Sequence, residues 1–261
     1  MSAADVKMPV KLAVAAPSLR TDDLFEALQA RILSDEWKAG GRLPSERELA
    51  ENYDTNRNTL REAIRRLEQA GLVTVRQGQG VTVSDFRRTG SLELASPFIA
   101  HGRDVREKAQ IILDLLEPRK RLLEFVVERF MERHQPADLT KLEEAHRAIR
   151  AAEAARSAPG LIASETEFYE TMVAATRDQI ARWMARPLLD LNRDIQTRWS
   201  GIVVFEPSLS LFTSKFMQAA SARDAKTALV HLRKHYDAID LTVRAMLLPL
   251  ALPQTKAKDA L

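Results

Sequence analysis

The chain has 261 residues, and 45% of them are apolar, which is enough for a buried core and excludes wholesale disorder. Its 39 Lys and Arg residues against 36 Asp and Glu residues leave a net charge of +3. That balance is too mild to identify a nucleic-acid-binding protein, so the argument depends on where the charges lie. The chain contains no cysteine, which excludes disulfides and thiolate metal sites and fits a reducing cytoplasm.

Residues 1–18 are expected to form a disordered leader. Their apolar run at residues 10–16 raises the alternative of a secretory signal, but Lys11 interrupts the run and Asp5 precedes it. The chain has no run of about 18 apolar residues, so the sequence predicts no membrane span.

Three helices are predicted in the next stretch. The first begins near Thr21 and ends before Gly40. Ser45 and Glu48 have the spacing of a capping box, which predicts a short helix to about residue 52. Asn56 can cap a third helix that runs to residue 70. The short connection between the last two helices is typical of a helix-turn-helix.

A small β-hairpin is predicted directly after the third helix. Residues 72–75 and 81–83 alternate like strands, and the segment between them contains Gly78 and Gly80. A hairpin that follows a helix-turn-helix is a wing. Residues 19–85 are therefore predicted to form a winged helix-turn-helix domain.

The rest of the chain is predicted to be almost entirely helical. Residues 86–102 are interpreted as a linker with a short helix at 91–95, residues 103–250 as an all-helical bundle and residues 251–261 as a loose tail. Pro187 is expected to kink or interrupt one of the helices. The predicted fold is therefore mainly α, with one small hairpin. The predicted helical segments are 105–134, 137–156, 161–177, 179–199, 209–222 and 224–248.

Basic side chains gather on the third helix and the wing. Residues 57–80 carry five arginines and two glutamates, a net of +3 that equals the charge of the whole chain. Arg57, Asn58 and Arg61 lie near the start of the helix, where a recognition helix contacts bases. The alternative is an ordinary solvated helix face. Gly78 has two interpretations as well: close approach of the wing to DNA, or a simple turn.

Several motifs together resemble the GntR family of bacterial regulators. They are LPSERELA at residues 43–50, NRNTLREA at 56–63, LE at 67–68, GLV at 71–73 and RQGQG at 76–80. The resemblance implies that the family's DNA-contact positions fall on Arg47, Arg57, Asn58, Thr59, Arg61 and Gly78. Thr55-Asn56 departs from the family pattern before the arginine, so the base preference is open to change.

The C-terminal half resembles the FadR branch of that family, which carries a helical domain called FCD. The supporting features include Glu117-Pro118-Arg119 and Phe168. The resemblance implies a homodimer that binds a double-stranded DNA operator and a small-molecule effector. Effectors of this branch are organic acids, sugar acids or acyl-CoA.

Many members of the branch bind a metal through one Asp and three His. Transferred to this chain, those positions fall on Glu165, Tyr169, Thr213 and His235, so only one imidazole is kept. Such a set suits a first-row metal poorly, and we expect no metal or other cofactor. His231, four residues before His235, leaves a different metal site open, although a structural pair is the favoured interpretation.

Three residues are candidates for effector binding: Arg119, Tyr169 and His235. A guanidinium suits a carboxylate or phosphate, and the alternative for Arg119 is a salt bridge. Because Lys120 and Arg121 are its neighbours, the inward-facing residue is uncertain from the sequence. Trp183 and Trp199 are expected to be core residues.

The sequence thus predicts a cytoplasmic, effector-controlled transcription regulator, with repression favoured over activation. An enzyme is the first alternative, but no nucleophile elbow, Ser/His/Asp order or phosphate-binding glycine loop occurs, so no catalytic residue is assigned. A DNA-architectural protein whose helical half only dimerises is the second alternative.

Overall fold

The computed structural model describes residues 20–78, 80–198 and 208–252. The leader at residues 1–18, Trp199 and most of the tail therefore lie outside the described residues. The chain divides into two compact units, which are described separately. Unit 1 comprises residues up to Ile32 together with Glu36–Thr89, and unit 2 comprises Leu33–Asp35 and the chain from Gly90 onward.

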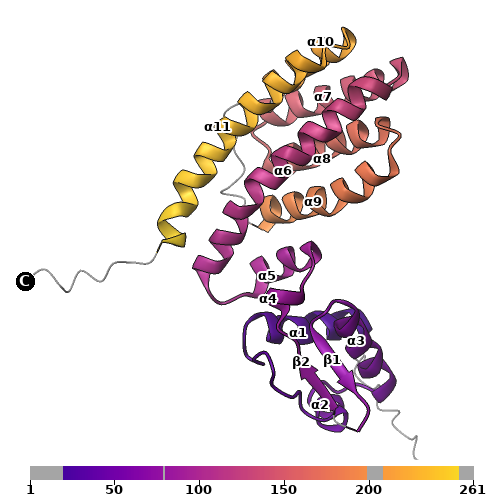
Figure 1. Ribbon diagram of the computed structural model, residues 1–261, viewed down its shortest axis with the longest axis vertical. Helices are drawn as coiled ribbons and strands as arrows, with labels where there is room; N and C mark the ends of the chain where they lie inside the picture. Colours follow the sequence, from indigo (N-terminus) through magenta and orange to yellow (C-terminus); the bar gives the residue numbers. More distant parts are fainter. Residues whose placement is uncertain (1–19, 79, 199–207, 253–261) are drawn as a thin grey trace, which may run out of the picture. The chain divides into compact units, whose positions relative to one another are not determined.

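Unit 1 contains helices α1, α2, α3 and α4 and a two-stranded antiparallel sheet (Figure 1). The sheet pairs Val73 with Val83 and Arg76 with Gly80. Apolar side chains from α1 and α3, among them Leu24 and Leu60, are fully buried and form the core. The elements are α1 (Thr21–Leu33), α2 (Glu46–Asn52), α3 (Arg57–Gln69), β1 (Val73–Arg76), β2 (Gly80–Val83) and α4 (Phe86–Thr89).

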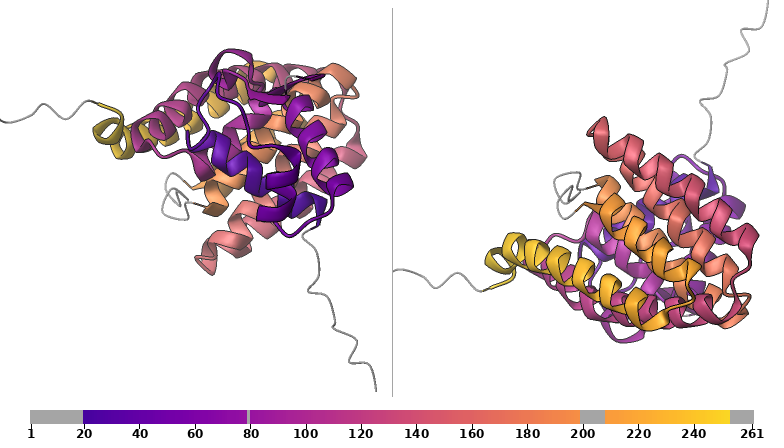
Figure 2. Two further views of the ribbon diagram at one scale, coloured as in Figure 1. Left: turned by 90° about the horizontal axis from the view of Figure 1, so that it is seen from below. Right: turned by 90° about the horizontal axis from the view of Figure 1, so that it is seen from above.

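Unit 2 is all helical within the described residues. α6 packs along α11, α7 packs on α8 and α10, and α8 packs on α9 (Figures 1 and 2). The predicted mainly α fold with one hairpin is confirmed. The elements are η1 (Leu92–Leu94, a 3₁₀ turn), α5 (Ala95–His101), α6 (Val105–Arg133), α7 (Pro136–Ala154), α8 (Ala158–Ala175), α9 (Gln179–Arg198), α10 (Leu209–Ser221) and α11 (Ala225–Ala251).

Residues 86–102 hold more helix than predicted. Instead of one short helix at 91–95, the segment contains α4, η1 and α5. Pro97 lies in the first turn of α5, where backbone N–H groups have no intrahelical acceptor, so the missing donor costs little. Phe98 and Ile99 are buried, and this apolar burial holds the segment in helical form.

Pro187 does not interrupt its helix, contrary to one of the two predicted outcomes. α9 continues through it from Gln179 to Arg198. Proline removes the hydrogen bond to the carbonyl four residues earlier, which belongs to Trp183. Trp183 is on the exposed side of the helix, where water can replace the lost donor.

The core of unit 2 consists of two apolar clusters. The larger is centred on Phe130, Phe168 and Phe216, and the smaller on Ile99, Ile112 and other residues of α5, α6, α9 and α11. α6 contributes to both clusters along its 29 residues. No helix of the described ranges is long and apolar enough to cross a membrane.

The prediction that Trp183 is a core residue is wrong, because 65% of its surface is exposed. The buried side of α9 is formed instead by small and branched residues, including Ala181, Ala185 and Leu191. Alanines allow the neighbouring helix to approach closely, which leaves the larger side chain on the outside.

Candidate functional site

Capping hydrogen bonds fix where the two helices of the helix-turn-helix begin. The Ser45 hydroxyl accepts a hydrogen bond from the Glu48 N–H at 3.3 Å, and the Glu48 carboxylate accepts one from the Ser45 N–H at 2.8 Å. This is the predicted capping box. The turn then passes through Asp54, whose φ of 45° is left-handed, a conformation that a short polar side chain tolerates. Asn56 starts α3 by accepting a hydrogen bond from the Thr59 N–H at 2.9 Å.

The orientation of α3 follows from its apolar residues. Its buried side consists of Leu60, Ala63, Ile64 and Leu67. The first turn therefore presents Arg57 and Asn58 to solvent, with Thr59 half-buried beside them. Three of the six residues assigned to DNA contact thus share the start of one helix, where base edges are reached in a major groove.

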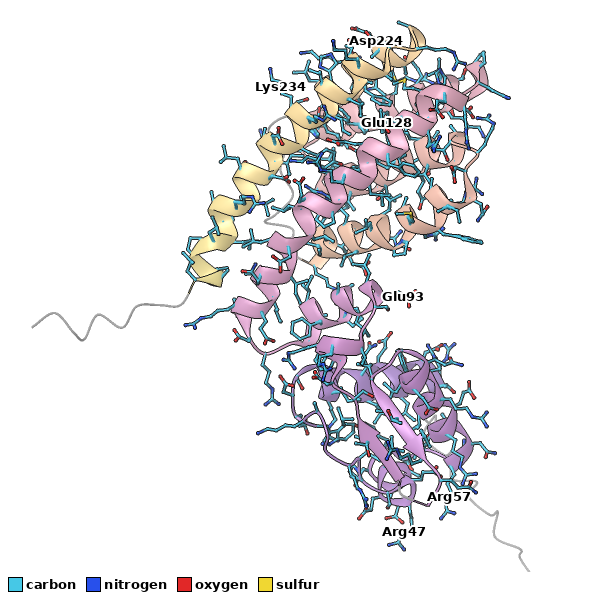
Figure 3. The ribbon with its side chains drawn as sticks, viewed as in Figure 1. Arg47, Arg57, Glu93, Glu128, Asp224 and Lys234 are labelled. Atoms are coloured by element: carbon cyan, nitrogen blue, oxygen red, sulfur yellow. The ribbon has the colours of Figure 1, made fainter. Side chains whose placement is uncertain are left out.

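The arginines of this surface differ in how freely they can bind a ligand. Arg57 has no ion-pair partner among the described residues, and Arg47 is 73% exposed with only a 3.9 Å contact to Glu51. The two project from the same end of unit 1 (Figure 3). Arg61 is 60% exposed, but its Nε donates to Glu46 at 2.8 Å. Arg57 is therefore the least engaged of these three arginines.

Arg66 contacts other residues of unit 1, which leaves it less available to bind a partner. Its guanidinium bonds to Asp22 of α1 and lies 4.5 Å from the centre of the Phe25 ring. It was counted among the five arginines of the basic window, so that count overstates the charge available to a partner. The pairing was invisible in the sequence because Asp22 lies 44 residues away.

The wing needs its glycine for conformation. Gly78 has φ 74°, which residues with a Cβ rarely adopt, and no atom lies within 4 Å of the position that a Cβ would take. The turn therefore accounts for this glycine, and the space around it leaves the backbone accessible. Arg76, the last residue of β1, is exposed on the same hairpin.

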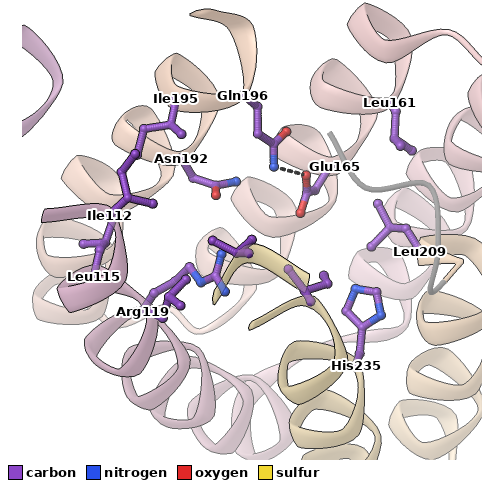
Figure 4. A pocket seen from close by; sticks show the side chains of 13 residues that line it. Ile112, Leu115, Arg119, Leu161, Glu165, Asn192, Ile195, Gln196, Leu209 and His235 are labelled. Carbon is purple, nitrogen blue, oxygen red and sulfur yellow. Dashed lines mark hydrogen bonds between the residues drawn. The ribbon is translucent and has the colours of Figure 1, made fainter. Parts of the chain in front are cut away.

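In unit 2, side chains from α6, α8, α9, α10 and α11 line a pocket that is partly open to solvent. Eight of its thirteen lining residues are aliphatic, and they include Ile112 and Val243. Its polar side chains come from Arg119, Glu165, Asn192, Gln196 and His235, which point toward a common space (Figure 4). The pocket thus combines an apolar wall with a small polar group, as ligand sites usually do.

Arg119 is the cation of this pocket. Only 14% of its side chain is exposed, and its Nη2 donates to Asp240 of α11 at 2.6 Å. The guanidinium also lies 4.6 Å from the centre of the Tyr236 ring. Arg121 points away from the pocket and is 67% exposed, which resolves which residue of the run faces inward. The salt-bridge interpretation of Arg119 is therefore confirmed, and its place in the pocket lining leaves effector binding as a prediction.

His235 is the second polar group of the predicted site. It is buried, its ring stacks on Phe212 at 4.6 Å, and its Nε2 has no hydrogen-bond partner. Burial, with a smaller contribution from the positive charge of Arg119, lowers the pKa of His235 from 6.5 to about 4. The imidazole is consequently neutral near pH 7.

Glu165 completes the polar side of the pocket. Gln196 donates to its Oε2 at 3.0 Å. Burial raises the pKa of the Glu165 carboxyl, although this hydrogen bond and the charge of Arg119 oppose the shift. The neutral form of Glu165 is thereby favoured more than in water.

Tyr169 lies outside this pocket. It is 2% exposed, and its hydroxyl accepts a hydrogen bond from Tyr236 at 2.7 Å. It lines a smaller hollow together with Arg119. Burial raises the pKa of the Tyr169 phenol, which keeps it neutral. Of the three predicted effector-binding residues, Arg119 and His235 therefore line this pocket, and Tyr169 lines the neighbouring hollow.

The positions that hold a metal in related proteins do not fit a metal here. Tyr169 is a neutral phenol engaged by Tyr236, and the Thr213 hydroxyl is bonded to Nδ1 of His146 at 2.8 Å. Glu165 is held by an amide rather than by a cation. A divalent ion would find one free imidazole, which is a poor donor set.

The alternative pair His231 and His235 does not form a larger cluster. His231 is half-buried one turn before His235 on α11. No group of three or more His, Cys, Asp or Glu side chains suited to a metal occurs within the ranges that the structure describes.

The sequence prediction missed Asn192, Gln196 and Asp240 as parts of the site. Asn192 and Gln196 are four residues apart, so they share one face of α9, and this spacing was the available signal. Asp240 pairs with a residue 121 positions away, and no local pattern reveals such a contact.

The chain was compared with known proteins and structures. Residues 20–83 match the family of bacterial regulatory proteins described as the gntR family, and residues 114–238 match the FCD domain. Mce2R of Mycobacterium tuberculosis is 37% identical over 128 residues, covering 49% of this chain and 52% of that protein. The Uxu operon transcriptional regulator of Escherichia coli is 33% identical over 150 residues, covering 57% and 55%.

A third relative and one structure extend the comparison. LutR of Bacillus subtilis, an HTH-type transcriptional regulator, is 32% identical over 124 residues, covering 47% of this chain and 53% of LutR. The chain thus spans about half the length of these curated relatives. The structure of Lar, described as controlling the Listeria monocytogenes agr system, is 12% identical with a TM-score of 0.59, and the match covers 87% of this chain and 97% of Lar, which supports the fold. With both of its domain types matched, the chain belongs to the GntR family of bacterial regulatory proteins and carries an FCD domain.

Proposed function

We propose that this protein is a transcriptional repressor whose operator affinity is controlled by a small metabolite. DNA binding is assigned to residues 19–85, and effector binding and dimerisation are assigned to residues 103–250. The observation that carries the proposal is the start of α3, where the Arg57 and Asn58 side chains are exposed on a helix fixed by its caps. A guanidinium there can bind guanine with two hydrogen bonds or clamp a phosphate.

The position of Arg47 also supports the proposal. Arg47 and Arg57 lie at one end of unit 1, so one can bind a phosphate while the other reaches the groove (Figure 3). Thr59, Arg61 and the wing at Gly78 would add contacts on either side. Arg61 would have to exchange Glu46 for the DNA, which makes its contribution smaller than that of Arg57.

Two copies are proposed to act together. Two heads related by a two-fold axis would contact half-sites about one helical turn apart on a palindromic operator. An effector in the FCD domain would favour a head arrangement with lower operator affinity, and a preference of several kcal/mol for one arrangement would release the DNA. Such a protein acts on chromosomal DNA, so we place it in the cytoplasm. Organic acids, sugar acids and acyl-CoA are the effector classes to test.

The test is the salt dependence of binding to duplexes from the DNA beside its own gene. Arg57→Ala should weaken binding at least about tenfold if Arg57 bonds a guanine. If it clamps a phosphate, the slope of log affinity against log salt should fall by about one. Arg186→Ala is the matched control, since Arg186 is an exposed arginine of α9 paired with Asp190. Equal affinities and slopes for the two variants would refute the assignment of α3.

Repression and sensing need a second measurement. A reporter behind the bound duplex should be more active when the protein is absent and should respond to a metabolite that stabilises the protein thermally. Ligand binding raises thermal stability in proportion to RT ln(1 + [L]/Kd). A protein that binds DNA but is stabilised by no metabolite would be a scaffold rather than a sensor.

A further inference from the structure

We infer that the effector is a small aliphatic monocarboxylic acid, whose carboxylate is bound directly by Arg119 and His235 in competition with Asp240. This inference rests on the proposed sensing function and narrows its three effector classes to one. It is carried by the unpaired polar atoms of the pocket, by its charge and by its walls.

Two buried polar atoms without a hydrogen-bond partner belong to residues of this pocket. Among the described residues, only three buried side-chain nitrogen or oxygen atoms have no hydrogen-bond partner, and two of them belong to this pocket. They are Nε of Arg119 and Nε2 of His235. A buried donor without an acceptor costs about 1–3 kcal/mol, so an acceptor supplied from outside would be stabilising.

The charge of the pocket selects one negative group. Arg119 is its single permanently charged cation within the described lining, and Asp240 already neutralises it in part. With the imidazole hydrogen on Nε2, His235 can donate a second hydrogen bond while remaining neutral. Burial raises the pKa of the Glu165 carboxyl, which lessens its repulsion toward a bound anion. One carboxylate can therefore accept hydrogen bonds from both unpaired donors, Nε of Arg119 and Nε2 of His235.

The walls of the pocket determine the rest of the ligand. Ile112, Leu115, Leu116, Ile195, Ile239 and Val243 provide a continuous aliphatic side. The many hydroxyl groups of a sugar acid would outnumber the remaining polar partners, Glu165, Asn192 and Gln196, so some would lie unpaired against these aliphatic residues, which is unfavourable. A second carboxylate would suffer more, and the phosphates of acyl-CoA would find no cation besides Arg119 within the described lining. An alkyl chain fits the wall and is stabilised by burial.

Asp240 gives the site an internal competitor. It occupies Nη2 of Arg119 at 2.6 Å, and Lys120 lies 3.9 Å from its other oxygen. An incoming carboxylate must share or displace this contact. When the ligand displaces it, Lys120 and Arg244 still offset the charge of Asp240, so the carboxylate is not left without nearby cations. Removing the charge of Asp240 should therefore tighten ligand binding.

The test is calorimetric titration of the full-length protein with linear monocarboxylates from butanoate to decanoate, in the presence of EDTA. Affinity should rise about fourfold per added methylene until the wall is filled. 1-Hexanol, gluconate and adipate should bind far more weakly than hexanoate. The EDTA excludes a metal bridge, so binding that disappears on its addition would overturn the direct contact to Arg119.

Two variants with opposite expected effects separate a ligand contact from a structural role. Arg119→Gln should weaken the carboxylate by about tenfold or more, and Asp240→Asn should tighten it by about threefold. Arg121→Gln is the matched control, because this exposed neighbour points away from the pocket. A purely structural salt bridge would make both substitutions harmful or neutral to binding.

The outcomes also separate this inference from the proposed function. If gluconate or a CoA thioester binds and releases the DNA while the monocarboxylates do not bind, the inference fails and the sensing function stands. If operator DNA is bound but no compound of any class binds or alters that complex, the sensing function fails with it. Monocarboxylate affinity that Arg119→Gln leaves unchanged would overturn the assignment of the pocket.

Discussion

The buried imidazole of His235 makes the stability of the protein depend on pH. Its pKa is about 4 in the folded chain, against 6.5 for an ordinary histidine. Between these values the unfolded chain binds a proton that the folded chain does not. Stability is therefore fully present above pH 6.5 and is lost progressively as the pH falls toward 4.

The magnitude follows from the shift. Each pKa unit corresponds to 1.36 kcal/mol, so the contribution of His235 to the free energy of unfolding should fall by about 2 kcal/mol between pH 7 and pH 5. Two charged groups act on the imidazole besides its burial. Arg119 lowers its pKa and Glu153 raises it slightly. His146, whose pKa is also lowered by burial, adds a loss in the same direction.

The assay is urea unfolding of the wild type and of His235→Phe at pH 7 and pH 5, followed by circular dichroism. Phenylalanine keeps the stack on Phe212 but does not titrate. The variant should lose about 2 kcal/mol less than the wild type over this interval, and the contribution of His146 cancels in the comparison. Equal losses in the two proteins would refute the argument that His235 is neutral and desolvated.

Two further substitutions test the helix caps and the buried phenols. Ser45→Ala should cost about 1 kcal/mol of stability, because it removes the acceptor for the Glu48 N–H, and unchanged urea unfolding would contradict the capping role. Tyr236→Phe should cost about 1–3 kcal/mol, since it leaves the buried Tyr169 hydroxyl unpaired, whereas the double variant with Tyr169→Phe should recover most of that loss. A double variant no more stable than the single one would show that the hydroxyl pair does not explain the cost.

The helices were predictable from the sequence where they are marked by local chemistry. Ser45 and Asn56 cap α2 and α3 through hydrogen bonds to residues three positions away, so the signal is contained in a few letters. Gly71 follows α3 with φ 72°, the conformation that favours glycine after a helix. These boundaries agree with the structure to within one or two residues.

The site was less predictable because its contacts join distant parts of the chain. Arg119 could be singled out by type and family position, but Asp240 could not, since the ion pair depends on how α6 packs on α11. The prediction that Trp183 is a core residue was wrong for a related reason. Periodicity gives the apolar side of a helix, but it does not say that alanines will form the buried face of α9 while a tryptophan remains outside.

The two apolar clusters of unit 2 have a consequence for the pocket between their residues. Ile112, Ile195 and Val243 belong to the smaller cluster, and Leu161 and Leu209 to the larger, and all five face the same hollow. An alkyl chain bound there would contact both clusters and join them into one continuous hydrophobic core. With the alkyl chain bound, the two halves of the bundle should unfold together on heating. Without it, the α5 end should loosen first.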